Sequence, residues 1–139
     1  MLNMKSVLLV EDDNIDAMTV ERSFRELDFK VSLARTTNGE EALEYLQNPD
    51  NEIPGIILLD LNMPKMNGIE FLKVIKNDNQ LKHIPVIIFT TSKEEYDVIK
   101  SFELSVAGYI IKSFEYQKFL DSMKMLQNYW VLSLLPQKA

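Results

Sequence analysis

Five short runs of apolar residues recur along the chain, and a segment with helical spacing of apolar residues follows each of them. Three runs are unbroken by polar residues and cover residues 7–10, 56–59 and 86–89. Unbroken aliphatic runs of this length are typical of strands buried on both faces of a sheet. The run at 31–35 partly alternates and the run at 109–111 is short, so both are typical of edge strands.

The segments between the runs repeat apolar residues at spacings of three and four, which predicts amphipathic helices. We expect helices near residues 14–27, 40–46, 69–75, 93–104 and 115–132. In the fourth of these helices the spacing turns Ile99 and Phe102 inward. Alternating strands and helices predict an α/β fold with a doubly wound, five-stranded parallel sheet and helices on both faces. The strand order 2-1-3-4-5 of the flavodoxin-like winding places the unbroken runs in the middle.

Length, charge and cysteine content narrow the class of protein. The 139 residues suit one domain, which we expect to span 1–139 with residues 129–139 as a C-terminal extension. A net charge of −6 argues against nucleic acid as a partner. The chain has no cysteine, no apolar run of membrane-spanning length and no signal-peptide profile at its start. We therefore expect a cytoplasmic protein without a membrane partner.

The polar residues that directly follow four of the apolar runs are candidates for one shared site. They are Glu11, Asp12 and Asp13 after the first run, Asp60 after the third, Thr90 after the fourth and Lys112 after the fifth. The carboxyl ends of parallel strands share one rim of the sheet, where ligands bind in such folds. Crowded carboxylates favour a bound cation, and oxygen ligands without His or Cys favour Mg²⁺. An aspartate beside Mg²⁺ and a lysine can accept a phosphoryl group as an acyl phosphate.

Each of these residues also has an ordinary structural explanation. Acids are favoured at a helix N-terminus, Asp60 can cap the turn that follows it, and Lys112 can be a solvated surface charge. The phosphoryl-transfer interpretation is favoured because the residues at all four strand ends suit this one reaction.

Four motifs resemble the receiver domain of bacterial two-component response regulators. They cover residues 7–13, 57–64 with Gly68, 85–92 and 108–112, and the resemblance extends over essentially the whole chain. It implies a stand-alone response regulator, which is a phosphoacceptor signalling protein rather than an enzyme, although it would catalyse its own phosphoryl transfer and slow dephosphorylation. The Thr-Thr-Ser and Lys-Ser forms and the tail are similar to single-domain regulators that partner phytochrome-type histidine kinases.

The resemblance also implies roles for individual residues. Asp60 would be the phosphoacceptor, loaded by a sensor histidine kinase. Mg²⁺ would be bound by Asp12, Asp60 and the backbone carbonyl of Asn62, with Glu11 reaching the ion through water.

A switch is implied by the same resemblance. Lys112 would contact the phosphoryl group, while Thr90 moves inward and Tyr109 turns in as its partner. The family usually has a proline after this lysine, joined by a cis bond, whereas this chain has Ser113. A cis bond to serine would cost about 2.5–4 kcal/mol against about 0.5–1 for proline, so the conformation of this loop is an open point.

The C-terminal helix carries more apolar residues than one buried stripe requires. Spacings of four, three and four allow an inward stripe of Phe119, Met123, Leu126 and Trp130. We predict that the surplus supports a two-fold homodimer through the fourth helix, the fifth strand and the fifth helix. The predicted interface consists of Tyr109, Tyr116, Leu120, Tyr129 and Trp130. The alternative is that the tail folds back over the same domain.

Other functions fit parts of the pattern. A degenerate receiver would bind partners without phosphorylation, and the missing proline keeps this alternative open. Asp60 and Asn62 loosely echo the paired acids of aspartyl-phosphate phosphatases of the haloacid dehalogenase type, but Asn62 is not an acid. A flavin carrier is disfavoured because acids, rather than a phosphate-cradling loop, follow the first strand.

Overall fold

The computed structural model describes residues 2–132, and its central feature is one parallel sheet with the strand order β2-β1-β3-β4-β5. The strands are β1 (Leu2–Val10), β2 (Ser32–Thr36), β3 (Ile53–Leu59), β4 (Val86–Thr90) and β5 (Gly108–Ile111). The helices are α1 (Asn14–Glu26), α2 (Gly39–Gln47), α3 (Gly68–Lys76), α4 (Glu95–Glu103) and α5 (Tyr116–Leu132). The predicted fold class and strand order are therefore confirmed.

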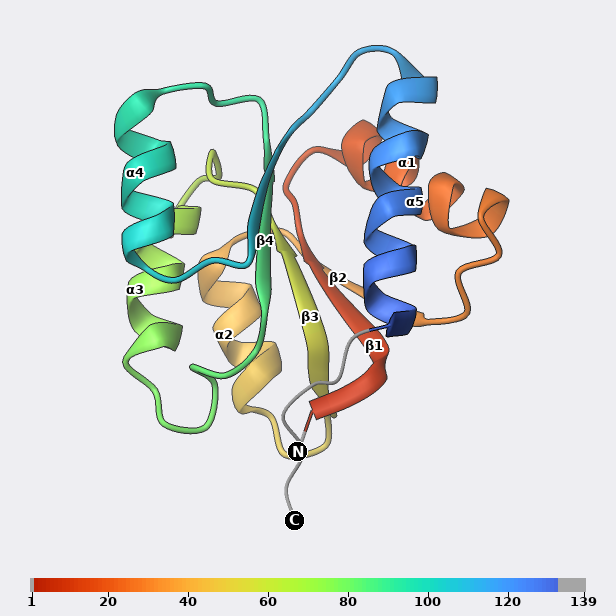
Figure 1. Ribbon diagram of the computed structural model, residues 1–139. Helices are drawn as coiled ribbons and strands as arrows, with labels where there is room; N and C mark the ends of the chain where they lie inside the picture. The colour runs from red at the N-terminus through yellow and green to blue at the C-terminus, as the bar shows by residue number, and fades with distance from the viewer. Residues whose placement is uncertain (1, 133–139) are drawn as a thin grey trace.

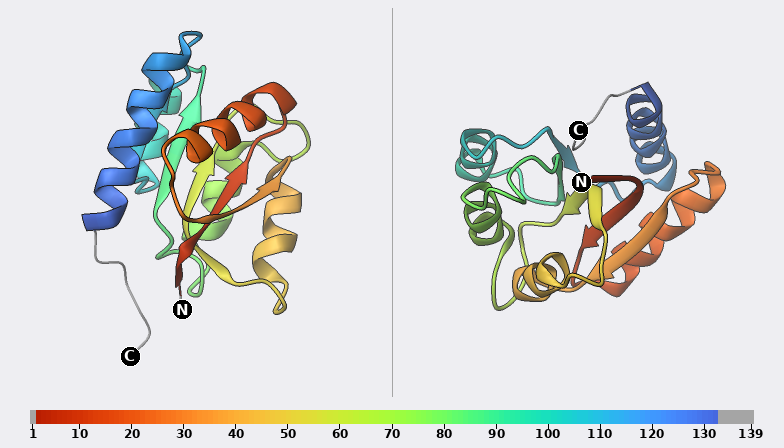
Figure 2. Two further views of the ribbon diagram at one scale, coloured as in Figure 1. Left: turned by 90° about the vertical axis from the view of Figure 1, so that its right-hand side faces the viewer. Right: turned by 90° about the horizontal axis from the view of Figure 1, so that it is seen from below.

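Two layers of helices cover the two faces of the sheet. Helices α1 and α5 lie on one face and α2, α3 and α4 on the other, as Figure 1 and the view from below in Figure 2 show. All strands run in the same direction, so their carboxyl ends gather at the upper rim in Figure 1. No helix in the described part of the chain has the length and apolar character needed to cross a bilayer.

The core lies around the three unbroken apolar runs. Residues 7–10, 56–59 and 86–89 are all buried, whereas the edge strands β2 and β5 are mostly half-buried. This difference confirms the assignment of central and edge strands, because only the central strands have a helix layer packed over both faces along their length.

Helix α4 differs from the prediction. Ile99 and Phe102 are 51% and 52% exposed, so the expectation that they point inward is wrong. The helix instead turns Ser101 toward the sheet, with Val98 and Leu104 half-buried beside it. With so few apolar residues in α4, two different stripes fit its sequence, and packing against the sheet favours the stripe spaced by three.

Helix α5 forms its predicted inward stripe of Phe119, Met123, Leu126 and Trp130, all buried. Since Trp130 is 6% exposed and belongs to the core, its predicted place in an exposed interface is wrong. Tyr116 also differs, because its ring lies 4.0 Å from the guanidinium of Arg22 and so faces α1 rather than β5. Of the predicted extension, residues 129–132 continue α5, and residues 133–139 lie outside the described part.

Candidate active site at the carboxyl rim

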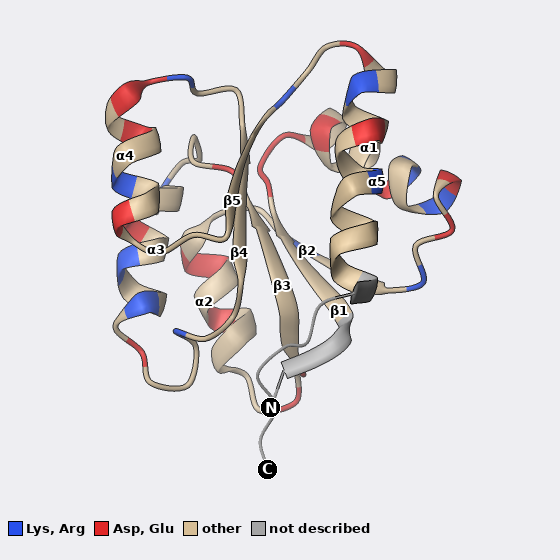
Figure 3. Ribbon diagram, viewed as in Figure 1, with Lys and Arg blue, Asp and Glu red and all other residues tan. Residues whose placement is uncertain are grey.

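Backbone hydrogen bonds continue past the strand ends and fix the polar residues of the rim. The Asp60 N–H donates to the Val10 carbonyl (3.0 Å), which sets Asp60 beside Glu11. The Lys112 N–H donates to the Thr90 carbonyl (2.8 Å) in the same way. Figure 3 shows the result as a red connection after β1 and a blue segment between β5 and α5 at the same end of the sheet.

The ammonium of Lys112 lies among three carboxylates. Its Nζ is 2.6 Å from Glu11 Oε1, 2.7 Å from Asp16 Oδ2 and 3.4 Å from Asp60 Oδ2. Burial by itself would lower the pKa of Lys112, but the hydrogen bonds and charges of these carboxylates raise it above its ordinary value. Lys112 therefore stays a cation at the place where a phosphoryl group on Asp60 would need one.

Glu11 is the most deeply buried acid of the rim. Its side chain is 1% exposed, and burial, reinforced by the charge of Asp60, raises the pKa of Glu11 to about 8 despite the opposing effect of Lys112. Glu11 Oε1 lies 2.6 Å from Lys112 Nζ, and Glu11 Oε2 accepts a hydrogen bond from the Asp13 N–H (3.2 Å). A buried carboxylate is costly in its charged form, so the charged form of Glu11 depends on a cation beside it.

The carboxylates of Glu11, Asp12 and Asp60 can hold a metal ion. Each offers an oxygen, and these atoms all lie within 4.8 Å of one another. Hard oxygen donors and the exposed position of Asp12, which leaves room for water ligands, fit Mg²⁺. A bound Mg²⁺ would neutralise charge at Asp60. The Asn62 N–H donates to Asp60 Oδ1 (3.3 Å), and the role of the Asn62 carbonyl as a ligand stays a prediction.

The backbone around Asp60 passes too close to Gly68 for any side chain to fit at that position. A Cβ at Gly68 would lie 2.5 Å from the Asp60 carbonyl oxygen and 2.8 Å from Leu61 Cα. The loop folds back this closely because α3 begins at once with a capping box between Asn67 and Glu70. Helix α3 thus holds the loop that begins after Asp60.

The predicted switch residues are linked through the loop after β4. Thr90 is fully buried, and its Oγ1 accepts a hydrogen bond from the Ser92 N–H (3.3 Å). The Tyr109 hydroxyl donates to the Ser92 carbonyl (2.9 Å), and burial raises the pKa of Tyr109 above its ordinary value. The bond between Lys112 and Ser113 is trans, like every peptide bond in the described part. The switching roles themselves stay predictions.

Two charged residues of the rim were not singled out by the sequence pattern. Asp16, in the first turn of α1, accepts the hydrogen bond from Lys112 described above. Arg35, at the end of β2, donates from Nε to the Glu11 carbonyl (3.0 Å) and from Nη1 to Asn14 Oδ1 (2.9 Å). Arg35 therefore braces the connection from β1 to α1 that carries the candidate metal ligands.

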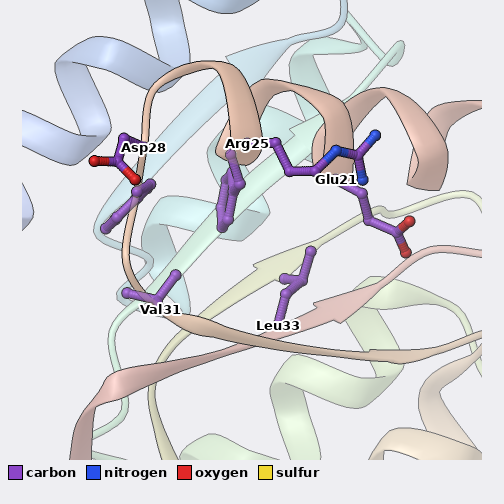
Figure 4. Close-up of a pocket in the computed structure, with 7 residues that line it drawn as sticks. Glu21, Arg25, Asp28, Val31 and Leu33 are labelled. Atoms are coloured by element: carbon purple, nitrogen blue, oxygen red, sulfur yellow. The ribbon is translucent and has the colours of Figure 1, made fainter.

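A separate hollow lies away from the rim, between the end of α1 and the edge strand β2. Its volume is about 440 Å³, and Figure 4 shows Glu21, Arg25 and Asp28 on one side of it and Val31 and Leu33 on the other. It contains none of the residues that surround Asp60, so it takes no part in the chemistry described above.

Known proteins are similar to this chain in sequence. A sequence model of the response regulator receiver domain matches residues 7–124. Response regulator Rcp1 of Synechocystis sp. is 36% identical over 131 residues, which cover 91% of this chain and 89% of that protein.

Solved structures agree with the sequence match. The phosphorylated cyanobacterial phytochrome response regulator RcpA superimposes with a TM-score of 0.89 at 33% identity, covering 96% of this chain and 99% of that chain. The Mn²⁺-bound form of response regulator Rcp1 gives 0.88 at 36% identity, with the same coverage of 96% and 99%. Bacteriophytochrome response regulator RtBRR gives 0.75 at 34% identity, covering 100% of this chain and 85% of that chain. With this fold and the acidic pocket at its rim, the chain belongs to the response regulator receiver domain family.

Proposed function

We propose that a sensor histidine kinase transfers a phosphoryl group to Asp60 and that this modification changes which partners the domain binds. The observation that carries the proposal is the grouping of the Asp60 carboxylate with the carboxylates of Glu11 and Asp12 and with the ammonium of Lys112. An Asp60 oxygen attacks the phosphorus of a phosphohistidine, an O–P bond forms, the N–P bond breaks, and the released imidazole takes up a proton. Lys112 offsets the charge that is gained.

The phosphoryl donor is proposed to be another protein. His83 is the one histidine of the chain, and it is exposed in the segment before β4, at the opposite end of that strand from the rim. Exposed apolar side chains near the rim, namely Ile15, Met18 and Phe114, offer a surface for a kinase domain. The names of RcpA and RtBRR support a phytochrome-type kinase as this partner. Histidine kinases use ATP, so we expect both proteins in the cytoplasm.

Incubation with acetyl phosphate and Mg²⁺, followed by intact mass measurement, tests the proposed function. One phosphoryl adduct per chain supports a phosphoacceptor. A chain that gains no adduct would be a degenerate receiver that binds partners without phosphorylation. Rapid release of phosphate over many turnovers would instead favour a phosphatase.

The changed binding surface is proposed to be the face formed by α4, β5 and α5, used by a second copy of the chain. Ile99, Phe102 and Tyr129 are 51%, 52% and 60% exposed on these elements, which leaves apolar and aromatic surface open to a partner. An apolar hollow of about 280 Å³ lies between β5 and α5 and is lined by Ile110 and Met125 among others. Tyr109 lies on β5, so its movement would couple phosphorylation to association.

Analytical ultracentrifugation with and without phosphodonor tests this dimer. Phe102→Ser should weaken association by at least about tenfold, because it removes roughly 1.4 kcal/mol or more of apolar burial. Met18→Ser removes a similarly exposed apolar side chain from α1 and serves as the matched control. A chain that stays monomeric at high micromolar concentration in both states would contradict the dimer.

A further inference from the structure

Asp16 belongs to the rim but not to the candidate metal ligands. Its Oδ2 accepts a hydrogen bond from Lys112 Nζ (2.7 Å), which joins the first turn of α1 to the end of β5. The first turn is held in place because the Asp16 N–H donates to the capping carboxylate of Asp13 (2.9 Å). Asp16 therefore reaches Lys112 from a rigid helix start.

Asp16 competes with Asp60 for the ammonium. The distance from Lys112 Nζ to Asp60 Oδ2 is 3.4 Å, longer than the distance to Asp16. The Lys112 side chain is 9% exposed and that of Asp16 37%, so water weakens this pair only in part. An ammonium has three N–H donors, and its contacts with Glu11 and Asp16 draw it away from the phosphoacceptor.

We propose that Asp16 is a positioning residue that holds Lys112 away from Asp60 and thereby slows phosphorylation. This inference rests on the proposed function of Asp60. With acetyl phosphate as donor, an Asp60 oxygen forms the new O–P bond while the bond between phosphorus and the acetyl oxygen breaks and acetate leaves. Lys112 lowers the barrier to this step only when its ammonium lies against the transferring oxygens.

The time course of phosphorylation at saturating Mg²⁺ tests the inference in the full chain. Asp16→Asn, which keeps the shape and removes the charge, should react about two- to fivefold faster, the range that a partly exposed ion pair supports. The acceleration should appear as a higher maximal rate rather than as a changed KM for acetyl phosphate. Asp16→Glu should return the rate toward that of the parent, and Glu21→Gln is the control for loss of one exposed charge on α1.

A double variant shows whether Asp16 acts through Lys112. On the Lys112→Ala background, Asp16→Asn should no longer change the rate. Persistence of the acceleration there, or a gain confined to KM, would mean that Asp16 only repels the anionic donor, and would overturn the positioning role.

Calorimetric Mg²⁺ titration gives a readout without phosphorylation. In Asp16→Asn, Lys112 is left to pair with Glu11 and Asp60, which are candidate metal ligands. Mg²⁺ should therefore bind more weakly than in the parent. An unchanged Mg²⁺ affinity would count against the inference. If the parent and Asp16→Asn chains were phosphorylated at equal rates, this inference would be overturned but the proposed function would not. A parent chain that gains no phosphoryl group would overturn the proposed function and this inference with it.

Discussion

The hydroxyl of Tyr109 donates a hydrogen bond to the carbonyl of Ser92 and so joins the edge strand β5 to the loop after β4. The distance is 2.9 Å, and the Ser92 hydroxyl in turn donates to Asp97 Oδ2 at 2.6 Å. Because this loop directly follows Thr90, a movement of Thr90 would be transmitted through Ser92 to β5 and α4.

Removing the Tyr109 hydroxyl should therefore destabilise the domain. We expect Tyr109→Phe to lower the free energy of unfolding by about 0.5–1.5 kcal/mol, the net value of one such hydrogen bond. Urea denaturation measures the change. Tyr96→Phe removes a hydroxyl from a tyrosine that is 66% exposed on α4 and should have almost no effect. Equal losses in the two variants would argue against a specific role for the bond to Ser92.

The close approach of Gly68 to Asp60 leads to a second prediction. Gly68→Ala should lower the free energy of unfolding by about 1–3 kcal/mol, the usual cost of forcing extra atoms into a packed site. It should also slow phosphorylation, since the Asp60 backbone must shift. Gly108→Ala is the matched control, because its Cβ would meet its nearest atom, Ile87 Cδ1, at 3.8 Å. If the two variants were equally stable, the geometry of the loop after β3 would be wrong.

Measured Mg²⁺ affinities of variants distinguish the residues that bind the metal from charged residues that only lie nearby. Asp12→Asn should weaken Mg²⁺ binding by about tenfold or more, the effect of losing about 1.4 kcal/mol of binding free energy. Asp13→Asn removes the same charge one residue away and keeps a capping side chain on α1, so its affinity should stay close to that of the parent. Lys112→Ala should not weaken binding, because an ammonium repels a cation. Isothermal titration calorimetry would contradict the metal assignment if Asp12→Asn bound Mg²⁺ as the parent does.

The centre of the sheet could be predicted from sequence because a strand covered on both faces has no polar positions. The buried runs at 7–10, 56–59 and 86–89 made this plain. Helix α4 could not be oriented in the same way, since its sequence allows either the stripe of Ile99 and Phe102 or the stripe around Ser101. The choice depends on how α4 packs against the sheet, which no local spacing contains.

The residues at strand ends could also be predicted, because parallel strands bring their carboxyl ends together whatever the loops do. Glu11, Asp60 and Lys112 meet for this reason. Asp16 and Arg35 reach the same place through side-chain length and rotamer, from a helix turn and from an edge strand. Nothing in their spacing distinguishes them from ordinary surface charges.

The most direct test of the central claim is to locate the phosphoryl group. After reaction with acetyl phosphate and Mg²⁺, borohydride reduces an aspartyl phosphate to homoserine, and tandem mass spectrometry of the digested chain identifies the reduced position. We expect reduction at residue 60 alone and none in Asp60→Asn. A reduced residue at another position, or a phosphoryl adduct that persists in Asp60→Asn, would contradict the assignment of Asp60 as the phosphoacceptor.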